Sequence, residues 1–314
     1  MSKKRKITLI ISSLFIALLC FHQFSIEADD KEGYKITDIR IYKDTPAWEL
    51  ALAVKRQRIR TIKKIVEKEP DLLNYQDPKY GATLLIWAVG MEKYRSAEAL
   101  LQCGADPDIA TTENTTYGGE TPLFLAAGYS WIDRWAKKDP KYVKLLLNYG
   151  ADPNKNYTGF NIPGSQSLIE VGTSPLMNSI GCGIEKTKAL VEAGAEINYK
   201  TTFGTTATIK ALMVRQFPEY AHYLIVGKYA TITEPFYRRI SYGNEDPNEK
   251  FYPVDLLRNW VFALDSEEYK IKMEIVKEFA RQGVNYWETK IHKSTLEHIQ
   301  KLYPDTWEEY IKKY

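Results

Sequence analysis

The chain contains few of the residues that build catalytic and metal-binding sites. Its 314 residues include 4 histidines and 3 cysteines. After the N-terminal segment only His222, His292 and His298 remain, and no cluster of cysteines or carboxylates completes a metal-ligand set with them. The sequence Gly-x-Ser-x-Gly, which forms the nucleophile elbow of many serine hydrolases, is absent. These absences give no support to a zinc enzyme or a serine hydrolase.

An excess of positive charge is also missing from most of the chain. The formal net charge is +3, and the four basic residues Lys3–Lys6 account for more than that excess. The remainder is nearly neutral, and its 44% apolar and 26% charged residues are ordinary for a globular protein. We therefore expect no nucleic-acid partner, because nucleic-acid binding leaves a basic footprint.

The N-terminal segment has the features of a secretory signal. The basic head is followed by the apolar run Ile7–Phe21 and then by a polar stretch that ends at the small residue Ala28. We expect cleavage after Ala28, which makes residues 1–28 a signal peptide and the mature protein exported, with a bacterial periplasm as the favoured compartment. One alternative is an uncleaved membrane anchor formed by residues 7–24, although a span needs roughly 20 apolar residues. A lipoprotein signal at Cys20 is a third, weaker reading, because Leu19 is not a small residue.

Pairs of short helices recur through the middle of the chain. Thr121 followed by Pro122 is a helix start, because the hydroxyl caps free N–H groups and proline at the first helical position sacrifices no hydrogen bond. A second apolar run then ends at Gly150, which accepts a left-handed backbone at little cost. Similar starts and ends occur elsewhere in the chain: Thr83 to Gly104, Ser174 to Gly194, and Thr206 to Gly227.

The start Thr-Pro-Leu, the two short helices and the terminal sequence Gly-Ala-Asp-x-Asn at residues 150–154 resemble the ankyrin repeat, with Phe124 where that family usually has histidine. The resemblance covers residues 45–287. It implies an all-α solenoid of about five to six helix–turn–helix repeats, without a cofactor, that binds another protein along its concave face. Two thiols two repeats apart, Cys103 and Cys182, are too distant for a disulfide in such a stack.

The two ends of the resemblance match poorly. Residues 29–44 form a polar lead-in to a degenerate first repeat, and residues 253–285 resemble a heavily altered sixth repeat. Residues 288–314 are expected to form an irregular helical cap over the open end of the stack. Within that cap, Ser294 and Glu297 have the spacing of a capping box, and Asp305 begins the last helix. We expect a monomer.

The second helix of the first repeat has a basic outer side. Its apolar positions, including Ile62 and Val66, follow a helical period, and Lys and Arg residues occupy much of the rest. A terminal repeat needs a polar outer face, so a solvated surface is the favoured interpretation. A phosphate-binding patch is the alternative.

Two insertions interrupt the repeats and are the candidate partner-binding segments. The first lies between the helices of the third repeat, from Tyr129 to Pro140, and the second extends from Lys155 to Val171. Insertions in such stacks map to loops that often bind partners. The candidate partner-binding residues are Trp131, Arg134, Trp135, Tyr157 and Phe160. The two insertions could form one contiguous surface. For the tryptophans, packing of an extended helix on its neighbour is an equally favoured alternative.

These observations together predict a non-catalytic protein-binding module that acts outside the cytoplasm. A role as an inhibitor or immunity-type protein fits such a module. A membrane-anchored scaffold is one alternative, and its contact with a membrane would be through the uncleaved N-terminal segment alone. An enzyme with a site in residues 229–314 is the other alternative, and scattered Glu and Lys residues are its only support.

Overall fold

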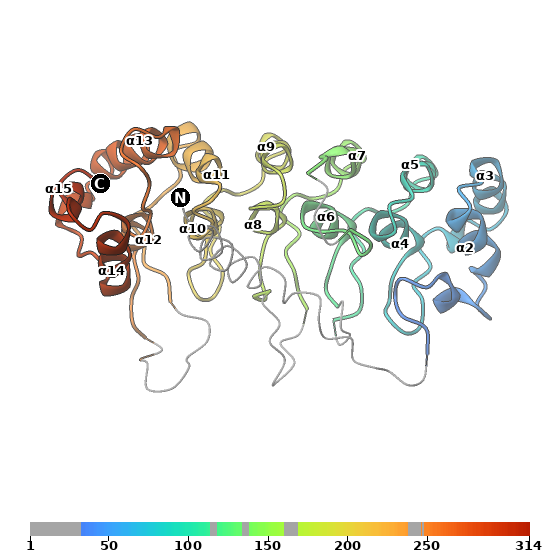
Figure 1. The fold of residues 1–314 in the computed structure, drawn as a ribbon. Helices are drawn as coiled ribbons and strands as arrows, with labels where there is room; N and C mark the ends of the chain where they lie inside the picture. The colour runs from blue at the N-terminus through green and yellow to red at the C-terminus, as the bar shows by residue number, and fades with distance from the viewer. Residues whose placement is uncertain (1–32, 114–117, 134–137, 160–168, 238–245, 247) are drawn as a thin grey trace, which may run out of the picture.

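The protein is an α-helical solenoid in which helix pairs follow one another along a single row (Figure 1). The computed structural model describes residues 33–113, 118–133, 138–159, 169–237, 246 and 248–314. Six helix pairs are formed by these residues: α2 (Trp48–Lys55) with α3 (Ile59–Lys68), α4 (Leu84–Gly90) with α5 (Tyr94–Gln102), α6 (Pro122–Ala127) with α7 (Lys141–Asn148), α8 (Pro175–Ser179) with α9 (Ile184–Glu192), α10 (Ala207–Met213) with α11 (Pro218–His222), and α12 (Pro253–Arg258) with α13 (Glu267–Arg281). This arrangement confirms the all-α repeat solenoid.

Short helices and turns complete the described part of the chain. The 3-10 helices are η2 (Ile39–Tyr42), η3 (Pro70–Leu72) and η5 (Tyr286–Glu288), and η4 (Tyr223–Gly227) is a π-helix. The last two α-helices are α14 (Lys293–Leu302) and α15 (Trp307–Ile311). Among the described residues, none of the helices is long and apolar enough to cross a membrane.

The predicted helix starts are confirmed at four repeats. In each case a hydroxyl accepts a hydrogen bond from the backbone N–H three residues later, which satisfies a donor that the helix itself leaves free. The capping residues are Thr83, Thr121, Ser174 and Thr206. Local sequence therefore sets where the first helix of each repeat begins.

The left-handed glycine predicted at the end of a repeat is confirmed in three repeats, whereas in the fifth the helix ends at the predicted Gly227 without that conformation. Gly104, Gly150 and Gly194 have φ angles of 94°, 86° and 91°, the left-handed region that glycine accepts readily. Gly227 does not, because the second helix of the fifth repeat continues into the π-helix η4, and the left-handed residue is Tyr229 with φ 55°. The π-helix ends at Gly227, and the left-handed residue follows two positions later.

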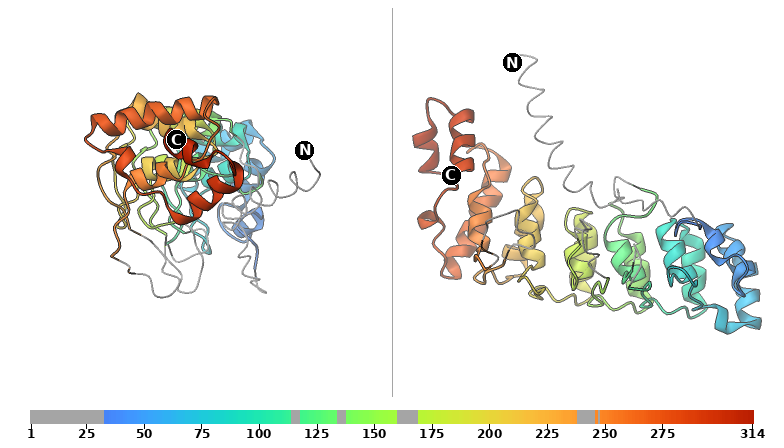
Figure 2. Two further views of the ribbon diagram at one scale, coloured as in Figure 1. Left: turned by 60° about the vertical axis from the view of Figure 1, so that its left-hand side comes forward. Right: turned by 90° about the horizontal axis from the view of Figure 1, so that it is seen from below.

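Leucines and alanines form the core that runs between neighbouring pairs. Leu100, Leu146 and Leu190, from the second helices of successive repeats, are all completely buried. Small residues such as Ala88 and Ala127 on the first helices allow the row of inner helices to approach closely. Figure 2 shows the helix pairs side by side along a gently bent row.

A ladder of side-chain hydrogen bonds links the ends of successive repeats. At each step a side-chain oxygen in one repeat accepts a hydrogen bond from a backbone N–H in the next. The pairs are Asn74 with Asp106 (3.0 Å), Asp108 with Asp152 (3.0 Å), Asn154 with Glu196 (2.8 Å), and Asn198 with Thr231 (2.9 Å). This ladder explains the terminal Asn of the sequence motif.

The turns before the first helices project as fingers, and backbone hydrogen bonds join neighbouring fingers. Thr112 N–H donates to Tyr80 O (2.8 Å), and Thr158 N–H donates to Gly119 O (3.2 Å). The fingers therefore form a continuous edge at the N-terminal ends of the first helices. We call this the finger edge, and we call the opposite edge, made by the turns between the two helices of each repeat, the turn edge.

Helices α14 and α15 pack over the last repeat. Tyr314 is completely buried, its hydroxyl donates to Arg258 O (2.6 Å), and its own backbone oxygen accepts from the Arg258 guanidinium (2.8 Å). The predicted capping box at Ser294 is wrong. His292 caps α14 instead, and its side chain accepts a hydrogen bond from Ser294 N–H. The buried Thr295 hydroxyl donates to Asn259 Oδ1 (2.6 Å), so tertiary contact outweighs the local capping pattern.

Candidate protein-binding surface

The insertion of the third repeat lies on the turn edge and reaches back to the second repeat. We call residues 129–140 the strap, of which residues 129–133 and 138–140 are described. Trp131 N–H donates to Gly90 O at the end of α4 (3.1 Å), and the indole packs on the Cα of Gly90. A Cβ atom at Gly90 would lie 2.3 Å from the Trp131 ring, so only glycine permits this approach.

The other described end of the strap reaches forward to the fourth and fifth repeats. Gly183, with φ 131°, faces the backbone of Lys138, and a Cβ at Gly183 would lie 2.8 Å from Lys138 O. The Lys138 ammonium lies 5.2 Å from the centre of the Phe217 ring, which follows α10. The strap thus contacts repeats on both sides of its own. The extended helix that could have carried the tryptophans is not seen in residues 129–133.

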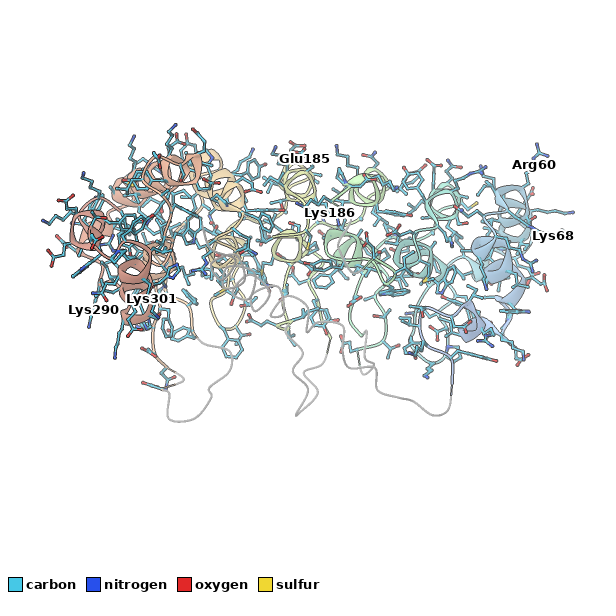
Figure 3. All side chains as sticks on the ribbon, in the orientation of Figure 1. Arg60, Lys68, Glu185, Lys186, Lys290 and Lys301 are labelled. Atoms are coloured by element: carbon cyan, nitrogen blue, oxygen red, sulfur yellow. The ribbon has the colours of Figure 1, made fainter. Side chains whose placement is uncertain are left out.

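Beneath the strap lies a small pocket closed by a buried lysine. Lys186, at the start of α9, is 4% exposed, and its ammonium donates to Gly128 O (2.8 Å). Figure 3 shows Glu185 on the outer side of α9 and Lys186 on the inner side. Burial lowers the pKa of Lys186, and the nearby Cys182, Asp139, Asp133 and Glu92 oppose this effect.

Polar groups surround the pocket and tie the strap to the stack. Ser130 hydroxyl donates to Glu92 Oε1 (2.8 Å), and Lys141 forms an ion pair with Asp139 at 3.3 Å. Tyr142 packs edge-on against another tyrosine of the turn edge, and burial raises its pKa. The enclosed volume is ≈ 30 Å³, room for a few water molecules at most. The arrangement therefore suits a structural junction rather than a substrate site.

The strap presents an apolar side chain that sequence reasoning missed. Ile132 is 52% exposed, while its neighbour Trp131 is partly buried against the core. Trp131 is a predicted partner-binding residue, but packing turns its ring inward and leaves Ile132 at the surface. Ile132 is therefore the apolar side chain of the described strap that a partner could contact, and the sequence carried no signal that distinguished it from Trp131.

At the finger edge, Tyr157 has a packing role. It is 7% exposed and stacks on Phe124 with ring centres 5.3 Å apart, and its backbone pairs with Thr173 and Gly172 at the base of the insertion. Burial of Tyr157 removes it from the surface that a partner could touch without rearrangement. Arg134, Trp135 and Phe160 lie outside the described residues, so their binding role stays a prediction.

The two insertions leave the stack at opposite ends of α6. The strap follows the C-terminal end of α6, and Thr158 pairs with Gly119 just before its N-terminal end. The described parts of the insertions therefore do not join into the single contiguous surface that the sequence suggested. They belong to the turn edge and the finger edge, respectively.

Glu120 is a second feature that the sequence did not reveal. It precedes the cap residue of α6, and its Oε2 atom is enclosed without a hydrogen-bond partner among the described residues. Burial raises the pKa of this carboxyl to about 8. The finger edge thus contains a carboxyl group that holds its proton near neutral pH.

In the C-terminal region the buried cations have structural partners. The Lys272 ammonium donates to Trp260 O (2.7 Å), and the Arg258 guanidinium donates to the backbone oxygens of Thr289 and Tyr314. Lys272 thus binds the backbone of its own repeat, and Arg258 binds the backbone of the cap. They give no support to the alternative of an enzyme site in residues 229–314.

Comparison with known families identifies part of the stack. Residues 50–157 match the family model described as ankyrin repeats (3 copies). This range contains α3 to α7 completely and most of α2. Residues 50–157 are therefore similar to ankyrin repeats, and such repeats indicate a protein-interaction module. No curated protein matches the chain.

Proposed function

We propose that this chain is an exported, non-catalytic ankyrin repeat protein that binds another protein through the strap and the finger edge. The observation that carries the proposal is the match of residues 50–157 to ankyrin repeats, together with a repeat stack that continues well beyond them. Ankyrin repeats present loops on a rigid helical support, and such loops are suited to partner binding.

The described part of the strap supplies a specific contact for this proposal. Ile132 is exposed, and the backbone bond between Trp131 and Gly90 holds that segment against α4. A fixed apolar side chain binds with a smaller loss of conformational entropy than one on a free loop. Ile132 is therefore our first candidate for a contact residue, with Trp131 as its support.

Affinity capture with the full chain from its native host, followed by titration of the captured partner, tests this contact. We expect Ile132→Asp to weaken binding of that partner at least tenfold, about 1.4 kcal/mol or more. Leu302→Asp is the matched control, because Leu302 is 47% exposed but lies on α14 of the cap. Equal affinities for the two variants would remove the strap from the binding surface.

The insertion at the finger edge needs a separate variant. Tyr157 and Thr158 hold the base of the finger, so a replacement that begins at Asn156 would damage the stack. Replacement of residues 160–168 by a Gly/Ser linker leaves those contacts in place. We expect an unchanged melting curve and at least tenfold weaker capture of the partner. Unaltered capture would place binding on the strap or on the concave face.

Export is proposed from the N-terminal sequence. We propose that residues 1–28 are removed and that the mature chain begins near Asp29 in a bacterial periplasm. N-terminal sequencing of the native protein tests this step, and an intact Met1 in a membrane fraction would favour the anchored scaffold formed by residues 7–24 instead. An intact Met1 in the cytosolic fraction would contradict both.

We further propose that the protein acts as a monomer and inhibits the protein that it binds. Repeats closed by a polar first repeat and a C-terminal cap leave no open end for self-association. Light scattering of the purified chain measures the oligomeric state. An assay of the captured partner with and without the chain measures inhibition, and an unchanged partner activity would leave binding without an inhibitory role.

A further inference from the structure

The first repeat carries a dense group of exposed basic side chains on its second helix, α3, and on the turn before it. We define the basic face by its exposed cations: Arg56, Arg58, Arg60, Lys63, Lys64 and Lys68. The only carboxylate within residues 56–68 is Glu67, so this segment carries +5. Lys3–Lys6 carry another +4, and since the whole chain has a net charge of +3, the remaining residues carry −6. The net charge of the basic face is therefore opposite in sign to that of the rest of the fold.

The basic side chains of this face are not neutralised by the fold. None of the six takes part in a salt bridge with another described residue, whereas Lys188 and Lys270 each pair with a glutamate three residues away on their own helices. Figure 3 shows Arg60 and Lys68 pointing away from the end of the row. The six cations are thus available to a partner.

The helix itself would be more stable without some of these cations. Arg58 is the N-cap of α3, it makes no side-chain cap hydrogen bond, and the first turn contains Arg60 but no acidic residue. Positive charge near a helix N-terminus opposes the helix dipole. By comparison, α13 begins with a serine cap and two glutamates, Glu267 and Glu268. A solvated polar face needs no such arrangement, since any polar residue would keep the end of the stack soluble.

The chemistry of the basic face fits a diffuse anionic surface better than a protein partner. None of the exposed large apolar side chains in the described chain lies within residues 56–68. Protein interfaces depend on buried aromatic or apolar anchors, and lysine is depleted from their centres. Clusters of four to eight Lys and Arg residues on an amphipathic helix are typical of segments that bind anionic lipids. The half-buried Ile59 and Ile65 flank the cations on the core side of this helix.

We propose that the basic face of α3 is an electrostatic docking surface for the phosphate headgroups of anionic lipids, which holds the first repeat against a membrane. The face lies on the first repeat, at one end of the row, so a membrane surface can approach it from outside the stack (Figure 1). Docking orients the row with its first repeat at the lipid and leaves the strap and the finger edge free. This inference does not depend on the identity of the protein partner.

Co-flotation of the full chain with lipid vesicles tests the proposal. Vesicles of phosphatidylcholine alone are compared with vesicles that also contain phosphatidylglycerol, at about 0.1 M salt, where the Debye length is about 10 Å. The measured quantity is the ratio of the two partition coefficients. Any insertion of the apolar N-terminal run contributes to both vesicle types.

Two variants with equal changes of net charge make the comparison specific. The test variant carries Arg60→Gln, Lys63→Gln, Lys64→Gln and Lys68→Gln, and the control carries Lys290→Gln, Lys293→Gln, Lys301→Gln and Lys312→Gln; all eight side chains are exposed. Glutamine has nearly the helix propensity of lysine and arginine, so both variants keep the fold. Lys3–Lys6 are the same in every protein.

We expect the test variant to lose at least tenfold in the partition ratio, and the control to stay within about twofold of the original chain. A ratio that is unchanged in the test variant would overturn the proposal, and so would equal losses in the two variants. Binding to duplex DNA or to poly-L-glutamate is measured in parallel. If the test variant loses binding to one of these polymers and keeps its binding to anionic vesicles, the basic face serves a macromolecular partner and the lipid proposal is wrong.

Discussion

The Nζ atom of Lys272 lies 4.1 Å from the centre of the Tyr314 ring. Both side chains are completely buried, one on α13 of the last repeat and the other after α15 of the cap. The Arg258 guanidinium lies 4.7 Å from the same ring. The cap is therefore joined to the stack through the cation–π contact of Arg258 and through backbone hydrogen bonds, as well as through apolar packing.

Tyr314→Ala should destabilise the protein strongly. The substitution removes a buried ring, its stacking on Tyr310 at 5.2 Å and its hydrogen bond to Arg258 O. We expect a loss of about 3–5 kcal/mol in the free energy of unfolding, measured by urea denaturation. Leu302→Ala, at a side chain that is 47% exposed, is the control and should change stability by less than about 1 kcal/mol. Similar losses in both variants would argue against a specific role of Tyr314.

Removal of residues 295–314 should expose the end of the solenoid. Trp260, Lys272 and Tyr286 are buried in the intact chain, and removal of the cap would expose the apolar surface around them to water. We expect a lower denaturation midpoint and association of the truncated chain, detected by light scattering. A truncated chain that stays monomeric with the original midpoint would show that α14 and α15 do not act as a cap.

The free energy of unfolding should depend on pH through Lys272. Burial, assisted by Arg258, lowers the pKa of Lys272 from 10.5 to about 6. Between these values the unfolded chain binds more protons than the folded one, so the free energy of unfolding rises with pH by up to about 1.4 kcal/mol per pH unit. This contribution to stability is lost as pH falls toward 6. Lys272→Met should flatten this dependence in urea denaturation at several pH values. An equal pH slope in Lys272→Met and in the original chain would contradict the prediction.

Glu120 should produce the opposite pH dependence. Its folded pKa is raised from 4.5 to about 8, so its favourable contribution is complete below pH 4.5 and is lost as pH rises through 8. Glu120→Gln, which resembles the protonated carboxyl, should therefore stabilise the protein by about 1–3 kcal/mol above pH 8 and have little effect near pH 4.5. Glu113→Gln, at an exposed carboxylate of the same finger, is the control and should show no such trend.

The contact between Gly90 and Trp131 can be isolated with a double-mutant cycle. Gly90→Ala improves helix propensity but places a Cβ 2.3 Å from the Trp131 ring, so it should destabilise the original chain by about 1–3 kcal/mol. In a Trp131→Ala background the obstruction is gone, and the same change should be neutral or stabilising. Denaturation of the four proteins measures the coupling. Additive effects would show that the strap does not pack on α4.

The sequence determined the repeat plan because that plan depends on local interactions. Thr121 and its counterparts cap helices by accepting a hydrogen bond from the backbone N–H three residues later. Glycines such as Gly150 end the helices by adopting a left-handed φ angle. The terminal Asn also appeared in the sequence motif, although its place in the inter-repeat ladder needed the structure. Recurrence of these local signals was sufficient to predict an all-α solenoid.

The tertiary structure alone decided the candidate surface and the buried charges. A lysine in an amphipathic helix is expected on the exposed face, yet Lys186 and Lys272 are buried. Each donates a hydrogen bond to a backbone oxygen outside its own helix, Gly128 O and Trp260 O, respectively. The aromatic content of the insertions drew attention to Trp131 and Tyr157, but packing against α4 and Phe124 turns both rings inward. Which side chain of an inserted loop faces solvent depends on what the neighbouring repeats offer it, and that information is distributed over segments that meet only when the chain has folded.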